Sequence, residues 1–335
     1  MIGQTSTKAK VDPELVVLYE HPQWQRPLFE ALERRGVSFA AFDLKSAVFS
    51  DRDVPDGRLY FNQASPSAYL RGNTRAVPFA LALIEDLESR GRRVLNGSKA
   101  FRIELSKITQ VGLMRRLNIP YPRTWAFNQV HALKSRADEL VFPAVVKPNQ
   151  GGSGARMVRV DSLEELLDFL EQNPDWWLPD NLLLLQEFLS HDSEGQGIVR
   201  MEFLGGELLY AMRIVSKGNF NLCPSEVCNP VRTEDTPNET ACEPHGSTSP
   251  RSAAPEFYPY PDVPESAVHM GKRLFKASGL DVGAVEYLET THGRRVFFDL
   301  NANSNLRRPI GEFFGFDPFE RLVDFLVAQL ELVSA

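Results

Sequence analysis

The sequence predicts an α/β protein in which a parallel sheet precedes a set of antiparallel strands. Over roughly the first 100 residues, short apolar runs alternate with helical patterns, which is typical of βαβ units. From residue 198 onward, apolar strands instead follow one another across glycine turns. Apolar residues make up 43% of the 335 positions, which is ample for sizeable cores.

In the N-terminal part, two helices are predicted at 24–36 and 76–91, and each ends at a glycine. Strands alternate with these helices, so we expect a small doubly wound domain with a parallel sheet. The predicted strands lie at 14–20, 37–44, 58–63 and 92–97.

The middle of the chain mixes both kinds of element. One helix is predicted at 105–118, where apolar residues recur at helical spacing, and two prolines follow it. A second helix is predicted at 161–173, where Ser162 and Glu165 form a capping box. The predicted strands of this part lie at 141–147, 157–160 and 181–189.

The last part predicts mainly strands. Residues 232–256 contain almost no large apolar side chains and are rich in Pro, Thr, Ser and Glu, so we expect a disordered insertion there. The predicted strands are 198–204, 207–215, 220–228, 282–290 and 294–305, and the predicted helices are 265–280 and 318–332.

The bulk composition disfavours several function classes. The net charge is −7 and the pI is about 5.5, so we expect neither nucleic acid nor an anionic membrane as a partner. Cys223, Cys228 and Cys242 are too few and too scattered for a disulfide framework or a zinc site. No apolar run reaches the length of a membrane span, and residues 1–13 lack the apolar segment of a signal peptide. We therefore expect a cytoplasmic protein with a disordered leader at 1–13.

The first functional signal is a lysine at the mouth of a glycine-rich turn. Lys147 ends an apolar strand, and the turn that follows reads NQGGSG. Glycines let backbone N–H groups approach an anion closely, so this turn can be a flap over phosphate. A plain structural hairpin explains the same pattern. It is not a P-loop, because the lysine precedes the glycines and a strand follows them.

The second signal is a group of carboxylates on apolar strands. Asp299 and Asn301 are two residues apart on one predicted strand and so face the same side, and Glu286 lies on the neighbouring strand. Such hard oxygen ligands suit Mg²⁺, or Mn²⁺, held against phosphates. Alternatively, Asp299 and the asparagines shape a strand-end turn, although carboxylates on such strands still need a cation partner or a metal.

Five segments follow one another in a specific order: a lysine-bearing helix, a strand lysine with its glycine loop, an apolar strand ending in Gln-Glu, and two carboxylate strands. They read ELSKITQVGLMRRLNIPYPRTW, PAVVKPNQGGSG, LLLQEFL, GLDVGAVEYLE and VFFDLNANSN. This order resembles the ATP-grasp superfamily, specifically its RimK-type and glutathione-synthetase-like carboxylate–amine ligases, over about residues 15–330. The resemblance implies an ATP-grasp fold with an N-terminal parallel-sheet domain that precedes it.

The resemblance also implies a division of the chain into domains. The N-terminal domain would span 14–100, a small subdomain with the glycine flap would span 101–187, and a C-terminal subdomain with the metal site would span 188–335.

By the same resemblance, each matching position has an expected role. Glu286, Asp299 and Asn301 would hold Mg²⁺, with Asp299 at a position where the family commonly has glutamate. Asp192 or Glu194 would accept a hydrogen bond from the ribose. The residues expected to bind ATP are Lys107, Lys147, Gly151, Gly152, Ser153, Gly154, Gln186, Glu187, Phe188 and Leu189.

Candidate catalytic residues lie on the strands after residue 198. Arg200 and Arg213 follow apolar residues, and the resemblance directs such arginines at the substrate carboxylate and an acyl phosphate. A surface position is the alternative for each. Asn221 lies where RimK-like enzymes carry an asparagine loop near the γ-phosphate.

Further substrate contacts are expected from two loops. Arg307 and Arg308 follow the carboxylate strand, and one of them could clamp an anionic substrate through a bidentate pair. In the N-terminal domain, the polar segment 61–72 with Arg71 is either a substrate loop or an ordinary connection.

The implied activity is an ADP-forming ligation of a carboxylate to an amine through an acyl phosphate. The substrate would be an amino acid, a peptide or a small metabolite, and analogy with related ligases suggests a homo-oligomer, a dimer or a tetramer. Two alternatives stay open, namely an ATP-binding regulatory protein without turnover and a phosphotransferase on the same fold.

Overall fold

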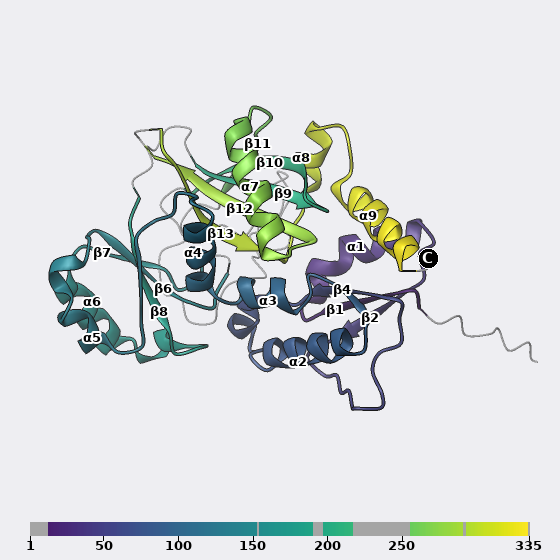
Figure 1. Cartoon of the computed structure of the whole chain (residues 1–335), viewed down its shortest axis with the longest axis horizontal. Coiled ribbons are helices and arrows are strands. Elements are labelled where there is room, and N and C mark those ends of the chain that lie inside the picture. The colour runs from purple at the N-terminus through teal and green to yellow at the C-terminus, as the bar shows by residue number, and fades with distance from the viewer. Residues whose placement is uncertain (1–12, 153, 190–196, 217–254, 291–292, 334–335) are drawn as a thin grey trace, which may run out of the picture.

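The computed structural model describes residues 13–152, 154–189, 197–216, 255–290 and 293–333. Three sheets organise these residues, and each has its own set of covering helices (Figure 1). The predicted leader at 1–13, the strand at 220–228 and the insertion at 232–256 fall outside the described ranges, apart from their borders at residues 13, 255 and 256.

The N-terminal sheet is parallel, as the alternation of strands and helices predicts. Its strands lie in the order β2-β1-β3-β4. Successive residues of β1 point to opposite faces, so Val16 packs under α2 while Leu15 packs under α1. The elements of this part are β1 (Leu15–Tyr19), α1 (Pro22–Arg34), β2 (Phe39–Asp43), β3 (Leu59–Gln63), the 3₁₀ helix η1 (Pro66–Arg71), α2 (Ala76–Ser89) and β4 (Arg93–Leu95).

A small antiparallel sheet, in the order β5-β8-β6-β7, forms the middle of the chain. Half of the capping box predicted for α6 forms: the Ser162 hydroxyl accepts a hydrogen bond from the N–H of Glu165 at 3.1 Å, whereas the Glu165 carboxylate accepts from the N–H of Asp161 at 2.7 Å. The strand β5 is not among the predicted ones, since its four residues carry too little pattern. The elements are β5 (Thr124–Phe127), α5 (Val130–Lys134), η2 (Ala137–Glu139), β6 (Ala144–Pro148), β7 (Val158–Val160), α6 (Leu163–Gln172), η3 (Pro174–Trp177) and β8 (Leu183–Glu187).

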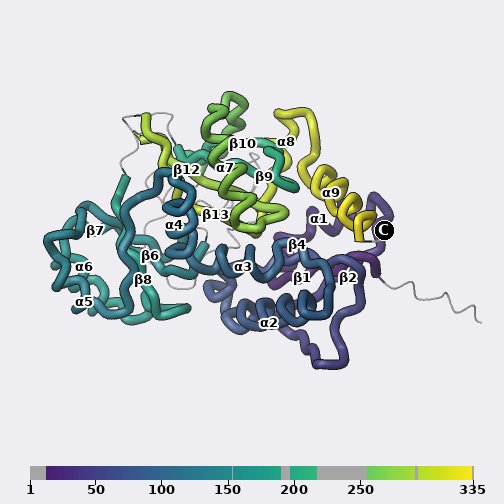
Figure 2. The backbone as a smooth tube through the Cα atoms, in the orientation of Figure 1, coloured from purple at the N-terminus to yellow at the C-terminus, as the bar shows by residue number. Residues whose placement is uncertain are grey.

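The third sheet is antiparallel, in the order β11-β10-β9-β12-β13. The helix α7 covers one of its faces, and α9 lies beside α1, so the last helix shares a core with the first sheet (Figure 2). Its elements are β9 (Ile198–Leu204), β10 (Glu207–Val215), β11 (Glu256–Pro259), α7 (Glu265–Ser278), β12 (Val282–Glu289), β13 (Arg295–Asn301), α8 (Arg308–Phe313) and α9 (Pro318–Leu332).

The helix predicted at 105–118 corresponds to α4 (Lys107–Arg116), which begins two residues later and ends two residues earlier than predicted. A further helix, α3 (Ser98–Glu104), precedes it and was not predicted. Ser106 separates the two helices: it has extended backbone, and its hydroxyl accepts a hydrogen bond from the N–H of Thr109 as the N-cap of α4. Leu105, before this cap, packs against the core of the N-terminal sheet, whereas Leu113 within α4 packs against the third sheet.

Side chains of α3 and α4 occupy the outer edge of β13. Gln110 binds both peptide groups of Leu300: its Nε2 donates to the carbonyl oxygen at 3.0 Å, and its Oε1 accepts from the N–H at 3.0 Å. Oε1 of Glu104 accepts hydrogen bonds from the N–H groups of Ala302 and Asn303 at 2.9 and 3.0 Å. These side chains therefore replace a neighbouring strand and hold the end of β13 in one place.

Replacing Gln110 with leucine should lower the free energy of unfolding by about 2–4 kcal/mol, because both buried peptide groups of Leu300 lose their partners. Urea denaturation measures this loss. The matched control is Gln172→Leu at the exposed end of α6, which we expect to change stability by less than about 0.5 kcal/mol. Equal effects of the two substitutions would contradict the edge-binding role of Gln110.

Candidate active site

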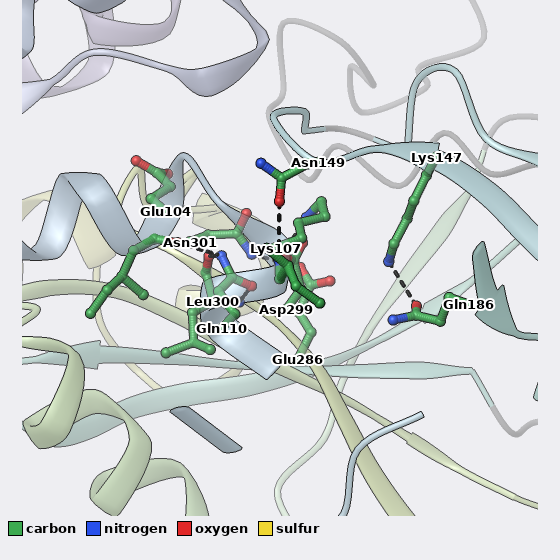
Figure 3. A network of polar contacts seen from close by, with 12 residues as sticks. Glu104, Lys107, Gln110, Lys147, Asn149, Gln186, Glu286, Asp299, Leu300 and Asn301 are labelled. Carbon is green, nitrogen blue, oxygen red and sulfur yellow. Dashed lines mark hydrogen bonds and ion pairs between the residues drawn. The ribbon is translucent and has the colours of Figure 1, made fainter. Parts of the chain in front are cut away.

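The predicted metal ligands meet on one face of the third sheet. Cross-strand register pairs Glu286 with Arg200 on one side and with Asp299 on the other, so these side chains share a face. Asn301 lies two residues beyond Asp299 on the same face, and its Nδ2 donates to Oε1 of Glu286 at 3.4 Å. The structure thus brings together the two carboxylates and the amide that the sequence singles out (Figure 3).

Each of these carboxylates has a cationic partner. Nζ of Lys107 lies 2.6 Å from Oδ1 of Asp299, and Nη1 of Arg200 lies 2.6 Å from Oε1 of Glu286. Burial raises the pKa of Glu286 in spite of the nearby Arg200. Both pairs use a single carboxylate oxygen, so the donor set of two carboxylates and one amide still fits a hard divalent cation such as Mg²⁺.

Arg200 is buried within the site and is held by two carboxylates. It is 3% exposed, and its Nε donates to Glu202 at 2.6 Å while its Nη1 pairs with Glu286. The Ser304 hydroxyl donates to the other oxygen of Glu202. Among the described residues, Nη2 of Arg200 has no hydrogen-bond partner although it is buried. A buried guanidinium with one unused donor is suited to bind an anion or a carbonyl oxygen.

Lys147 enters the site from the small sheet. Its Nζ donates to Oε1 of Gln186 at 2.7 Å, and Nε2 of Gln186 donates to the Thr124 hydroxyl at 2.9 Å (Figure 3). Burial, and after it the positive charge of Lys107, lower the pKa of Lys147 to about 7 against the opposing effect of Asp299 and Glu286. The two lysines and the two carboxylates, which come from α4 and two sheets, therefore form one electrostatic unit.

Asn149 follows Lys147 by two residues and binds the backbone of Lys107. This residue was not identified from the sequence. Its Oδ1 accepts from the N–H of Ile108 at 3.1 Å and its backbone oxygen accepts from the N–H of Lys107 at 3.2 Å, so it caps the start of α4. Its Nδ2 donates to Asp180 at 2.8 Å. Asparagine is a common capping residue, but the helix that it caps lies about 40 residues away in sequence, which no local pattern reveals.

The glycine-rich loop lies against the N-terminal domain. A Cβ at Gly152 would lie 3.5 Å from Cβ of Ser67, and a Cβ at Gly151 would lie 3.6 Å from the Tyr69 hydroxyl. Nε2 of Gln150 donates to the carbonyl oxygen of Pro66 at 3.4 Å. Gly154 has φ +67°, which favours glycine. Contact with η1 therefore connects the loop to the polar segment predicted at 61–72.

Comparison with known proteins decides the fold. No family model matches the chain. Solved structures match nearly all of it: the ligase PsnB complexed with a minimal precursor (18% identity, 95% of this chain and 100% of that chain, TM-score 0.65), a RimK-domain ATP-grasp protein from Sphaerobacter thermophilus (17%, 93% and 98%, 0.64), and D-alanine–D-alanine ligase from Bacillus anthracis (13%, 96% and 98%, 0.67). The chain has the ATP-grasp fold. This confirms the prediction from the five ordered segments.

Two curated proteins match a shorter stretch of 117 residues, which is 34% of this chain. The alpha-aminoadipate–LysW ligase LysX of Saccharolobus solfataricus is 27% identical there. The N5-carboxyaminoimidazole ribonucleotide synthase of Synechococcus elongatus is 32% identical there. The match covers 41% of the first protein and 28% of the second, so it spans less than half of either.

Within the ATP-grasp fold, Arg200 and Arg213, both predicted to face the substrate, lie on opposite faces of the third sheet. Arg213 pairs with Val199 across β9 and β10, which places it on the face opposite Arg200. There it contacts Glu289 at 3.2 Å, and its guanidinium lies 4.1 Å from the Tyr260 ring centre. The structure therefore does not bring Arg213 to the carboxylate cluster, because successive strand residues point to opposite faces and it is Met212 that pairs with Arg200.

The remaining arginines differ in burial. Arg307 is 6% exposed, its N–H donates to the Tyr210 hydroxyl at 3.0 Å, and its guanidinium lies 4.3 Å from the Phe257 ring centre. Arg308 pairs with Asp317 at 3.3 Å.

In the N-terminal domain, Arg71 pairs with Glu20 and donates to the Ser67 hydroxyl at 3.2 Å, and its guanidinium lies over the Trp24 ring at 4.6 Å. Arg71 therefore belongs to the segment that meets the glycine loop.

At the end of β8, where a nucleotide base is expected, most backbone groups already have hydrogen-bond partners. Glu187 donates its N–H to the Arg123 carbonyl at 2.9 Å, and its carboxylate accepts from the Arg123 N–H at 3.1 Å. Phe188 donates its N–H to the Pro143 carbonyl at 3.0 Å. Leu189 follows it as a half-buried residue. Four other residues named from the sequence, Ser153, Asp192, Glu194 and Asn221, lie outside the described residues.

None of the described helices is long and apolar enough to cross a membrane.

The lowered pKa of Lys147 predicts a stability that depends on pH. In the unfolded chain the amine keeps its proton up to about its ordinary pKa of 10.5, whereas in the folded protein it loses the proton above about 7. Between these values the unfolded state binds more protons, so folding stability contributed at this position rises with pH. From pH 7 to pH 10, the unfolding free energy of wild type should therefore rise relative to that of Lys147→Met. The rise should be at most about 1.4 kcal/mol per pH unit.

Denaturation at several pH values measures this slope. The control is Lys134→Met, an exposed lysine on α5 whose difference from wild type should stay flat over the same range. A flat difference for Lys147→Met as well would contradict the lowered pKa.

Proposed function

We propose that this protein is an ATP-dependent, ADP-forming carboxylate–amine ligase that works through an acyl-phosphate intermediate. The observation that carries the proposal is the largely buried cluster of two lysines, two carboxylates and one amide, assembled from α4 and both antiparallel sheets of an ATP-grasp fold. Such a cluster has the charges needed to hold a polyphosphate and a divalent cation.

The nucleotide would lie between the two antiparallel sheets. Lys107 and Lys147 would contact the phosphates, and the loop formed by Gly151, Gly152, Ser153 and Gly154 would close over them. Support comes from the lowered pKa of Lys147, since a buried amine without an anion beside it tends to lose its proton. The residues proposed at the base are Gln186, Glu187, Phe188 and Leu189, with Asp192 or Glu194 at the ribose.

Glu286, Asp299 and Asn301 would hold Mg²⁺ or Mn²⁺. Bound there, the cation would neutralise charge on the phosphates. A structure of PsnB was solved with Mg and ADP, which supports this pair of ligands for the shared fold.

The reaction would proceed in two steps. A substrate carboxylate attacks the γ-phosphorus of ATP, the bond to the β-phosphate oxygen breaks, and ADP leaves. Lys107, Lys147 and the unused Nη2 of Arg200 donate to the oxygens on which negative charge gathers. An amine then attacks the acyl carbon, the tetrahedral intermediate collapses, and phosphate leaves. The glycine loop would exclude water, which would otherwise hydrolyse the acyl phosphate.

The substrates would be an amino acid, a peptide or a small metabolite carrying the carboxylate, and an amine. Proteins of the same fold support this range, since PsnB was solved with a precursor peptide and the Bacillus anthracis protein is a D-alanine–D-alanine ligase. Arg71 and Arg307 are proposed contacts for an anionic part of the substrate, and Asn221 is proposed near the γ-phosphate. A cytoplasmic homo-oligomer, dimer or tetramer, belongs to the same proposal by analogy alone.

The test is ADP release from MgATP in the presence of a panel of carboxylates, peptides included, each with a pool of amines. Asp299→Ala should lower the rate by at least about 100-fold, because the cation that would neutralise the phosphates loses one of its ligands. The control is Asp138→Asn in η2, an exposed carboxylate that should leave the rate unchanged.

Mass spectrometry of the products separates the alternatives. A condensed amide supports the ligase. A phosphate ester in place of an amide would favour the phosphotransferase, and ATP binding without ADP release on the whole panel would favour the regulatory protein.

A further inference from the structure

Two buried oxygen atoms on the edge of β13 lack partners although their residues touch. Oε2 of Glu104 and Oδ1 of Asn303 have no hydrogen-bond partner within the described part of the chain. Glu104 is 4% exposed and Asn303 is 6% exposed, so water does not replace the missing partners easily. The other oxygen of the same carboxyl, Oε1, accepts the Asn303 N–H at 3.0 Å. A carboxylate oxygen and an amide oxygen both only accept, so neither can satisfy the other unless the carboxyl group carries a proton.

The orientation of the Asn303 amide is set by a third residue. Its Nδ2 donates to the backbone carbonyl oxygen of Gln63 at 3.1 Å. Turning the amide over would place Oδ1 against that carbonyl oxygen, which also only accepts. The amide oxygen is therefore the atom that remains for Glu104.

We propose that Glu104 is a neutral carboxylic acid whose Oε2–H donates a hydrogen bond to Oδ1 of Asn303, and that this bond positions residues 302–304 at the end of the carboxylate strand. Oε1 continues to accept from the N–H groups of Ala302 and Asn303. One carboxyl group then satisfies two backbone donors and one side-chain acceptor.

The electrostatic surroundings favour this proton. Burial raises the pKa of Glu104 to about 8, although the two backbone N–H groups lower it. The charged groups that act on it from the neighbouring elements are Asp299 on β13, which raises the pKa, and Lys107 on α4, which lowers it. At neutral pH the acid form predominates.

The positioned segment connects several parts of the candidate active site. It follows Asn301 directly, and the Ser304 hydroxyl donates to Glu202, which orients Arg200. Asn303 reaches the N-terminal domain through Gln63. Glu104 is therefore a positioning residue that acts through this segment. The effect of Glu104 on the reaction rests on the proposed function, whereas the protonation of Glu104 does not.

Infrared difference spectroscopy tests the proton directly. Wild type minus Glu104→Gln at pH 7 should show the carbonyl stretch of a protonated carboxyl, and this band should disappear with a midpoint near pH 8. Asn303→Ala, which removes the acceptor, should shift the midpoint to lower pH. The control is Glu171→Gln on the exposed side of α6, whose difference spectrum should lack the band at pH 7. Absence of the band for Glu104 at pH 7 overturns the proposal.

Thermal unfolding gives a second, independent test. Folded Glu104 keeps its proton up to about pH 8, whereas the unfolded chain loses it near 4.5, so wild type loses stability relative to Glu104→Gln as pH rises between these values. The Tm of Glu104→Gln minus that of wild type should grow from pH 5 to pH 8 and then level off. Glu104→Leu, which cannot bind the backbone N–H groups, should have a lower Tm than Glu104→Gln at every pH. A difference between Glu104→Gln and wild type that does not change with pH would overturn the proposal.

Binding of MgADP, measured by calorimetry, tests the positioning role. Glu104→Gln keeps all three contacts and should bind within about twofold of wild type, while Glu104→Leu should bind at least about tenfold more weakly, as for other residues that orient a ligand group. Equal binding by all three proteins overturns the positioning role. If the infrared band and the Tm trend hold but wild type does not bind MgADP, the proton assignment stands and the proposed function fails.

Discussion

The edge of β13 is the constraint on which the rest of the structure depends. An outer strand of a sheet exposes peptide groups that need partners, and here those partners are side chains from a helix pair far away in sequence. Gln110 binds Leu300, and Glu104 binds the two residues after Asn301. Because Lys107 lies on the same helix pair, the bonds that complete the sheet also bring a lysine to Asp299.

Charge balance explains how so many ionised groups are accommodated in the interior. Burying a charge is costly unless an opposite charge lies close to it. Arg200 lies between Glu202 and Glu286, and Lys107 pairs with Asp299. Lys147 is the exception, because it donates to the neutral amide of Gln186, and burial lowers its pKa. The site therefore has a place where an anion would be stabilised most strongly.

The N-terminal domain takes part in the site through short contacts. Asn96 donates to the carbonyl oxygens of Val282 and Ala302 and accepts from the N–H groups of Asp281 and Val282, so the end of β4 is bonded to the start of β12 and the end of β13. On the other side of the same domain, η1 meets the glycine loop. One domain thus contacts both the strand that carries the carboxylates and the loop proposed to cover the phosphates.

The sequence by itself determined the order of most strands and helices and which side chains share a face of the third sheet. Period-two and period-3.6 patterns and glycine stops predicted most elements, and the spacing of Asp299, Asn301 and Glu286 predicted a shared face, because these signals act over a few residues. Only the tertiary structure decided the short helix α3, whose Ala100 and Phe101 pack into two different cores, so that it has no single apolar face for a sequence pattern to reveal. It also decided that Arg200 faces the site and Arg213 does not, because the face of a strand residue depends on cross-strand register. The roles of Glu104, Gln110 and Asn149 were likewise beyond the sequence, because each binds backbone groups that are brought near only by folding.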